Sequence, residues 1–251
     1  MENSLIIIQA RLSSTRLPRK VLLPLWEGQN LLHLQIERIK QLGIPYVLAT
    51  TTNRQDDELE QWAQQNRVTF YRGEEQNVLK RFIDCTKEYK ADKLIRVCSD
   101  NPFLQFDQIP FYLDQLNKGV DYISFCDSQN TPAIKTHWGL FVEGVSLLAL
   151  EKAQELLRSQ PQRAFYQEHV TNFIYERPEI FKVALTKASA IIAKRNDLRF
   201  TIDTSEDFQN MARLLKVVNG TGNSLEELIK TTENYPRILV RMQDGIQSFK
   251  K

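Results

Sequence analysis

Short apolar runs alternate with amphipathic segments through the first half of the chain. The runs have the length of buried strands, and the segments between them carry apolar residues at the spacing of one helix face. This pattern predicts strands at residues 5–9, 46–51, 68–71 and 94–98. It predicts helices at residues 31–42, 56–66 and 77–89. Elements in this order indicate an α/β fold, a three-layer sandwich in which helices cover both faces of a mostly parallel central sheet.

The second half of the chain has a less regular pattern. It predicts strands at residues 122–126, 139–142, 181–185, 190–193 and 200–202, and helices at residues 146–157 and 164–175. A further helix is expected to start near Ser205, with acidic residues in its first turn, and to end at Val217 or Val218. Residues 219–223 predict a flexible break, residues 224–232 a last helix, and Lys250-Lys251 a tail. We therefore expect a domain at residues 1–218 and a C-terminal helical extension at residues 219–251.

The composition is typical of a soluble globular protein. The chain has 251 residues, of which 42% are hydrophobic and 25% are charged. A net charge of +2 is too small to favour nucleic acid as the main partner, so a small anionic ligand fits better. No apolar run approaches the length of a membrane span, and the first residues do not open a signal peptide. Cys85, Cys98 and Cys126 lie in apolar contexts and indicate reduced core residues of a cytoplasmic protein.

A basic loop follows the first predicted strand directly. Small residues keep its backbone accessible, namely Ala10, Ser13 and Ser14. Four cations surround that backbone: Arg11, Arg16, Arg19 and Lys20. Accessible N–H groups with fixed positive charge around them are what a polyphosphate needs. The residues alone leave a second interpretation open, a solvated basic loop after a strand.

Two aspartates also follow predicted strands, at the edge of the sheet where ligands of such folds bind. Asp100 follows strand 94–98 and stands before Asn101-Pro102, and Asp203 follows strand 200–202. Magnesium takes few protein oxygens and leaves its other positions to phosphates and water. Two carboxylates near a phosphate loop therefore predict a magnesium–nucleotide site. The alternatives are an Asx-type turn at Asp100 and a helix N-cap at Asp203.

Three further features carry weaker signals. Arg72 follows strand 68–71 and is a candidate contact for nucleotide or substrate, unless its loop simply leads into a helix. Glu168-His169 lies on an amphipathic stretch, where a histidine is commonly structural or at an interface. Gly220-Thr221-Gly222 has no strand before it and indicates a linker. The sequence contains neither GxGxxG after the first strand nor GxxxxGK[ST], which disfavours dinucleotide-binding and P-loop folds.

The segment Ile7–Leu22, which contains the basic loop, closely resembles the signature of the spore coat polysaccharide biosynthesis protein F family. That family is a branch of the cytidylyltransferases that make CMP-activated acid sugars, such as the acylneuraminate and 3-deoxy-manno-octulosonate cytidylyltransferases. Further matching motifs follow in order: Ala49–Asn53 with Asp56-Asp57, Arg72–Glu74, Val78–Phe82, Ile95–Pro102, Glu168–Thr171 and Arg199–Asp207. The chain departs from the family pattern at Ser13, Arg19 and Ser99, where glycine is usual, and at Asn77 and Asn101.

The resemblance implies a glycosyltransferase-A-like fold, as in nucleotide-diphospho-sugar transferases, and CTP as substrate. The expected nucleotide contacts are Ala10, Arg11, Ser14, Arg16, Lys20, Thr52 and Arg72, with Arg16 and Lys20 on the phosphates and Thr52 near the base. The expected catalytic residues are Arg11, Lys20, Asp100 and Asp203, of which the two aspartates would bind magnesium. The resemblance also implies a homodimer, with residues 125–195 in its interface and in the acceptor region.

These features predict a magnesium-dependent cytidylyltransferase that transfers CMP from CTP to a sugar or sugar-acid acceptor and releases pyrophosphate. We expect it to act in the cytoplasm in spore coat or other cell-surface polysaccharide or glycan biosynthesis, without nucleic acid or membrane partners. Its acceptor, which the sequence does not identify, is expected near Thr136-His137-Trp138 and Glu168-His169. Two other classes stay open: a nucleotide-sugar-dependent glycosyltransferase, which would typically carry a DxD pair, and a non-catalytic nucleotide-binding homologue.

Overall fold

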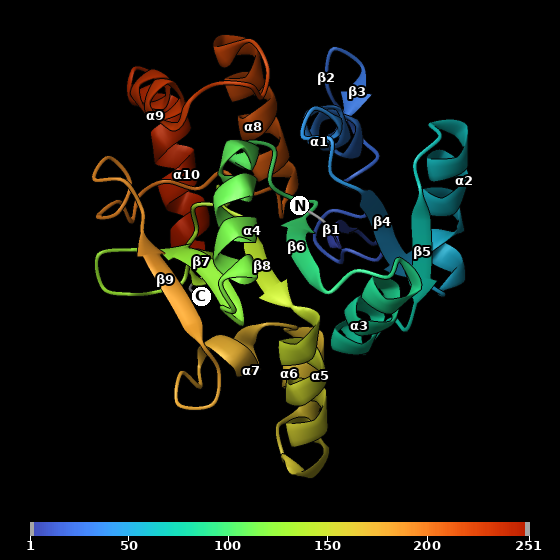
Figure 1. Ribbon diagram of the computed structural model, residues 1–251. Helices are drawn as coiled ribbons and strands as arrows, with labels where there is room; N and C mark the ends of the chain where they lie inside the picture. Colours follow the sequence, from blue (N-terminus) through green and yellow to red (C-terminus); the bar gives the residue numbers. More distant parts are fainter. Residues whose placement is uncertain (1–2, 249–251) are drawn as a thin grey trace.

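A seven-stranded sheet forms the centre of the protein (Figure 1). The computed structural model describes residues 3–248. The strand order is β5-β4-β1-β6-β8-β7-β9, and neighbouring strands are parallel except where β8 pairs with β6 and β7. The strands are β1 (Ser4–Gln9), β4 (Tyr46–Thr51), β5 (Phe70–Gly73), β6 (Lys93–Cys98), β7 (Tyr122–Cys126), β8 (Glu143–Ser146) and β9 (Val183–Lys187). A separate two-stranded ribbon joins β2 (Pro24–Trp26) to β3 (Gln29–Asn30).

Alternation of side chains along β1 explains why the fold has three layers. Leu5 and Ile7 pack into one apolar layer, whereas Ile6 and Ile8 pack into the layer on the other face. The first layer takes the inward faces of α3 (Val78–Glu88) and α5 (Leu147–Leu156). The second takes those of α1 (Leu31–Lys40), α2 (Asp57–Gln65) and α4 (Ile109–Asn117). The predicted three-layer α/β sandwich with a mostly parallel sheet is confirmed.

The first half of the chain follows the predicted order closely, and α1 and α3 begin at asparagine side chains that cap them. The Asn30 Oδ1 accepts a hydrogen bond from the His33 N–H at 2.9 Å, and the Asn77 Oδ1 accepts one from the Lys80 N–H at 3.0 Å. One strand differs from the prediction, since β5 starts at Phe70 and ends at Gly73. Arg72 therefore lies inside a strand and not in the loop after it.

The second half contains most of the differences. The predicted strand at 139–142 is wrong, because Gly139 has a φ of 63° and β8 begins only at Glu143. The predicted strand at 190–193 is a turn in which the N–H groups of Ile192 and Ala193 both donate to the Ser189 carbonyl. The predicted strand at 200–202 is a loop whose N–H groups donate to two different segments. The predicted helix at 164–175 is divided into α6 (Arg163–Glu168) and α7 (Asn172–Tyr175).

Three helices stand together at one end of the molecule, drawn in orange and red in Figure 1. They are α8 (Ser205–Val218), α9 (Leu225–Glu233) and α10 (Pro236–Ser248), and their apolar faces share one cluster. The first two match predicted helices, whereas α10 was not expected. The predicted tail at Lys250-Lys251 lies outside the described residues. Single 3-10 turns occur at Arg54–Asp56, Phe106–Gln108, Ala133–Lys135 and Leu157–Ser159.

Within residues 3–248, we find no helix with the length and apolar character that crossing a membrane requires.

Candidate active site

A pocket of about 340 Å³ lies where β1 and β6 end. We call it the central pocket. Its lining includes most of the predicted site residues: Ala10, Arg11, Ser14, Arg16, Lys20, Asp100 and Asp203. The carboxyl ends of adjacent parallel strands thus bring the basic loop and the first aspartate together, as the sequence predicts.

Lys20 stands between the two predicted metal ligands. Its Nζ lies 3.4 Å from the Asp100 Oδ2 and 3.3 Å from the Asp203 Oδ1. It also donates a hydrogen bond to the Ile202 carbonyl at 2.5 Å. The Ile202 N–H donates to the Asp100 carbonyl at 2.9 Å, which joins the two aspartate segments directly. The two carboxylates therefore converge on one cation, although about a hundred positions separate them in the sequence.

Asp203 has cations on both of its carboxylate oxygens. The Arg16 Nη2 lies 3.0 Å from Oδ1, and the Arg199 Nη2 donates a hydrogen bond to Oδ2 at 2.7 Å. Burial raises the pKa of this carboxyl, but the charges of Lys20, Arg199 and Arg16 outweigh burial and hold the pKa below its ordinary value. Asp203 is therefore ionised at neutral pH and held in one orientation.

The start of α8 fixes the position of Asp203. Thr204 is the N-cap of this helix, so the interpretation of Asp203 as the cap is wrong. The Asp207 carboxylate accepts hydrogen bonds from the N–H groups of Asp203 and Thr204, both at 3.0 Å. It also accepts two hydrogen bonds from the Arg199 guanidinium, each at 3.1 Å. The helix start, Arg199 and Asp203 thus form one hydrogen-bonded unit.

The basic loop contains one residue in a conformation that favours glycine. Arg19 has a φ of 60°, in the left-handed region, at a position where the resemblance expects glycine. Its guanidinium pairs with Glu58 on the surface. Asp56 supports the loop from within, because its Oδ1 accepts a hydrogen bond from the Leu12 N–H at 2.7 Å. Arginine thus adopts the left-handed conformation at the position where the resemblance expects glycine.

Thr52 and Arg72 are not among the residues that line the central pocket. The Arg72 guanidinium donates to the carbonyls of Thr51 and Asn53 at 2.8 and 2.9 Å, and it pairs with Glu60 at 2.6 Å. These contacts tie the ends of β4 and β5 together and favour a structural role for Arg72. The contact between Thr52 and the base stays a prediction.

Two buried arginines in the lining of the central pocket were not predicted as site residues. Arg81 is 1% exposed, and its Nη1 donates to the Glu74 carbonyl at 2.7 Å. Burial, with Arg11 nearby, lowers the pKa of Arg81 to about 10. Arg96 pairs with Glu143 at 2.6 Å across the β6–β8 register. Arg96 interrupts the apolar pattern of a strand, and Arg81 interrupts the apolar face of a helix. These interruptions are the sequence signal that could have identified the two residues.

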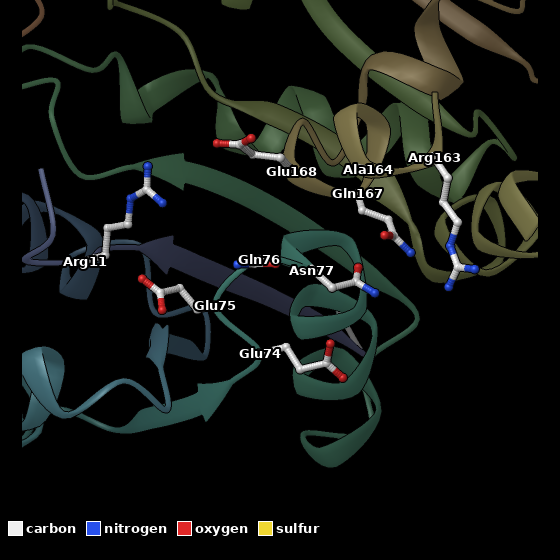
Figure 2. Close-up of a pocket in the computed structure, with 9 residues that line it drawn as sticks. All are labelled: Arg11, Glu74, Glu75, Gln76, Asn77, Arg163, Ala164, Gln167 and Glu168. Atoms are coloured by element: carbon white, nitrogen blue, oxygen red, sulfur yellow. The ribbon is translucent and has the colours of Figure 1, made fainter. Parts of the chain in front are cut away.

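A larger pocket of about 650 Å³ adjoins the central one, and we call it the outer pocket. Figure 2 shows the side chains that line it: Arg11, Glu74, Glu75, Gln76, Asn77, Arg163, Ala164, Gln167 and Glu168. They come from the basic loop, the segment that enters α3, and α6. Arg11 and Glu168 line both pockets, whereas Arg163 lies at the end away from Arg11 (Figure 2).

The expected acceptor region is only partly in place. Glu168 and His169 line the central pocket. Trp138 is buried instead, and its Nε1 donates to the Arg195 carbonyl at 2.7 Å. His137 Nδ1 lies 3.4 Å from the Arg199 Nη1, behind the Asp203 carboxylate. The segment Thr136-His137-Trp138 therefore supports the site from behind and does not line either pocket.

Magnesium fits the oxygen donors of the central pocket. No group of three or more histidine, cysteine, aspartate or glutamate side chains placed to hold a metal occurs within residues 3–248. The candidate ligands are therefore Asp100 and Asp203, whose carboxylates already face a shared cation, the Lys20 ammonium. Magnesium is commonly bound through one or two carboxylates, with substrate phosphates and water completing its shell.

Comparison with known proteins agrees with this geometry. The family model described as Cytidylyltransferase matches residues 5–235. The chain belongs to the cytidylyltransferase family. As a cytidylyltransferase it is a nucleotidyltransferase, and the resemblance found in the sequence is confirmed.

One relative of this cytidylyltransferase is the spore coat polysaccharide biosynthesis protein SpsF of Bacillus subtilis (strain 168). The two are 32% identical over 222 residues, which are 85% of this chain and 87% of SpsF. A solved cytidylyltransferase from Leptospira borgpetersenii is 27% identical with a TM-score of 0.80, covering 94% of this chain and 96% of its own. A CMP:2-keto-3-deoxy-manno-octonic acid synthetase complexed with CTP is 16% identical with a TM-score of 0.63, covering 86% and 99%, and shares the fold.

Proposed function

We propose that this cytidylyltransferase transfers CMP from magnesium-bound CTP to a sugar or sugar-acid acceptor and releases pyrophosphate. The observation that carries the proposal is the convergence of Lys20, Asp100 and Asp203 beside the basic loop. Family membership supports CTP as the nucleotide. The solved synthetase of the same fold is described in complex with CTP, which agrees with that assignment.

In the proposed reaction, an acceptor oxygen attacks the α-phosphorus of CTP. A bond forms between that oxygen and phosphorus, the bond to the bridging oxygen breaks, pyrophosphate leaves with the electron pair, and the proton of the acceptor hydroxyl passes to solvent. Arg16 and Lys20 would offset charge on the leaving pyrophosphate, and Arg11 would lie between nucleotide and acceptor because it lines both pockets. Phosphoryl transfer depends mainly on such positioning and charge neutralisation.

Asp100 and Asp203 would hold the magnesium ion. When bound, it supplies neutralisation of phosphate charge and lowers the pKa of the acceptor hydroxyl. Before nucleotide binds, Lys20 and Arg16 balance the charge of Asp203, so both cations already stand at the position where phosphates arrive. Their side chains would then be available to the phosphate oxygens, since Asp100 and Asp203 would hold the metal.

We place the acceptor in the outer pocket, which meets the central pocket at Arg11 and Glu168. Its lining offers carboxylates and amides, which bind sugar hydroxyls through paired hydrogen bonds. Its volume of about 650 Å³ is within the usual range for small-molecule sites. The polar lining also supports a hydrated substrate over an apolar one.

The name of the Bacillus relative supports a role in polysaccharide biosynthesis. We further propose a homodimer, because apolar side chains are exposed on the arm formed by α5 and α6. Leu148 is 75% exposed and Phe165 is 45% exposed. Sedimentation of the wild type and of a Leu148→Glu variant tests this contact, and a wild type that sediments as a monomer contradicts it. The cytoplasmic location stays a prediction.

Detection of pyrophosphate in a panel assay tests the proposed activity. The purified chain is mixed with CTP, magnesium and single sugars or sugar acids, with ATP, GTP and UTP as controls. Release of pyrophosphate from CTP in the presence of one acceptor class supports the proposal. Binding of CTP without turnover on any acceptor would favour a binding protein, and turnover of a preformed nucleotide sugar would favour a glycosyltransferase.

A further inference from the structure

The C-terminal helix α10 packs directly behind the candidate metal site. It begins at Pro236, one residue after the cytidylyltransferase family match ends. Ile238 and Met242 are buried on its inward face, and Gly245 follows on the same face at helical spacing. The Asn210 amide on α8 donates to the Ile238 carbonyl at 3.2 Å, which fixes one helix against the other.

Gly245 lies where α10 meets Arg199. A Cβ atom at position 245 would stand 3.1 Å from both the Cδ and the Nε of Arg199, and 3.4 Å from the Asp207 Oδ1. The first two separations are tighter than ordinary carbon contacts, so even an alanine there requires the arginine to shift by about a few tenths of an ångström. The glycine therefore permits α10 to close over the buried guanidinium.

Arg199 connects α10 to Asp203 through hydrogen bonds. Its Nη2 donates to the Asp203 Oδ2, and its Nε and Nη2 donate to the two oxygens of Asp207. The arginine is 1% exposed, so it has little room to turn and keep both carboxylates. With Oδ2 held from behind, the Asp203 Oδ1 is the oxygen that faces Lys20 and the central pocket.

We infer that Gly245 of α10 and Arg199 are positioning residues for the metal site, and that they hold the Asp203 carboxylate in the orientation that magnesium-bound CTP requires. This inference rests on the proposed function. It gives α10, which follows the family match, a role in the site, because α10 packs against the Arg199 guanidinium at Gly245. Groups that orient a metal ligand commonly change metal affinity when they are altered.

Calorimetric titration with CTP, once with magnesium and once with EDTA, tests the inference. The dissociation constant in EDTA divided by that in magnesium measures the metal-dependent part of CTP binding, and a lower ratio means less metal dependence. Arg199→Lys keeps the positive charge but loses the separate guanidinium N–H donors that bind the carboxylates of Asp203 and Asp207. We therefore expect it to lower this ratio about tenfold. Gly245→Ala should lower the ratio several-fold, with CTP affinity in EDTA unchanged.

Two matched controls separate positioning from general damage. Gln243→Ala makes an alanine on the exposed face of α10, and Arg195→Lys alters a forked arginine bound to Asp197 and Glu233 outside the site. Both should keep the wild-type ratio. In Gly245→Ala, the helical preference of alanine over glycine opposes the cost of shifting Arg199, so we expect only a small change in melting temperature. A role in stability alone would lower the melting temperature without changing the ratio of the dissociation constants.

A wild-type ratio in Gly245→Ala or in folded Arg199→Lys would overturn the inference. If Arg199→Lys does not fold, Gly245→Ala decides the matter alone. A wild-type protein whose CTP affinity is the same in magnesium and EDTA would overturn the metal assignment of the proposed function, and this inference with it.

Discussion

The central and outer pockets share a border but differ in how their charges are held. In the central pocket, each Asp203 oxygen has a cation within 3.3 Å, and buried Arg199 sets the orientation of the carboxylate. In the outer pocket, most lining side chains belong to the surfaces of α6 and of the segment that enters α3, and Arg163 and Glu168 are exposed. The charged groups of the central pocket are held in fixed positions, whereas the exposed side chains of the outer pocket can change conformation.

This difference corresponds to the two halves of the proposed reaction. In that proposal the triphosphate and its metal would be the same in every turnover, so a rigid array of charges would stabilise the transition state without rearrangement. The acceptor would instead meet exposed polar side chains, and such side chains on a helix can change without disturbing the fold. We therefore expect substitutions in the central pocket to act on chemistry and those in the outer pocket to act on acceptor binding.

The largest effect is expected from Asp203→Asn. Loss of one charge from the candidate metal site should lower magnesium-dependent pyrophosphate release by about two decades or more, while the protein still folds. The measurement is the rate of pyrophosphate release at saturating CTP, with circular dichroism as a check on folding. Asp114→Asn, on the exposed face of α4, should keep the wild-type rate. Full activity in Asp203→Asn would contradict the metal assignment.

Lys20→Met should have the next largest effect. It removes the ammonium that stands between Asp100 and Asp203, so CTP loses a charge-assisted contact. A hydrogen bond to a charged group is worth about 1.5–3 kcal/mol, which predicts an affinity for CTP about 10–100-fold weaker in EDTA. Calorimetry at constant ionic strength measures the affinity for CTP. Lys40→Met, which changes an exposed lysine of α1, serves as the control. Unchanged affinity would remove Lys20 from the phosphate site.

Arg163→Ala tests whether the outer pocket affects acceptor binding separately from CTP binding in the central pocket. We expect the KM for the acceptor to rise about tenfold, with kcat and CTP affinity unchanged, because this arginine lies at the end of the outer pocket away from Arg11. Steady-state kinetics with the acceptor found in the panel assay measures both constants. Arg158→Ala, exposed and paired with Glu155 on the surface, serves as control. A loss in CTP affinity would show that the two pockets are not separable.

The smallest effect is expected from Arg19→Gly. The left-handed backbone of Arg19 is strained by about 1–2 kcal/mol, and glycine relieves this strain but costs about 0.5–1 kcal/mol in chain entropy. The free energy of unfolding should therefore change by no more than about 1.5 kcal/mol, as measured by urea denaturation. Glu58→Gln removes the surface pair alone and serves as control. A large loss of CTP affinity would place Arg19 in the phosphate site.

The sequence predicted that the basic loop and the first aspartate would lie together, because local rules determine this, whereas the roles of these residues stay predictions. A strand that ends at Gln9 must be followed by a loop at the edge of the sheet, and the position of Asp100 after β6 follows from the same rule. The acidic residues after Thr204 predicted a helix start near Ser205, and so the place of Asp203 directly before α8. These signals lie within a few residues of the groups they position.

The rest depends on contacts that are distant in sequence. Nothing near Arg199 shows that Gly245 will pack against it, and nothing near Arg96 names Glu143 as its partner. The apolar run before Glu143 has the composition of a strand, but Gly139 turns the chain and delays β8. Such positions are decided by packing of whole elements, which local patterning does not contain.

A crystal structure of the protein with CTP and manganese would test the metal assignment, since the anomalous signal locates the metal. We expect one metal peak in contact with the carboxylates of Asp100 and Asp203, with the triphosphate along the basic loop and Arg16 and Lys20 on its oxygens. A metal bound away from both aspartates, or a triphosphate in the outer pocket, would contradict it.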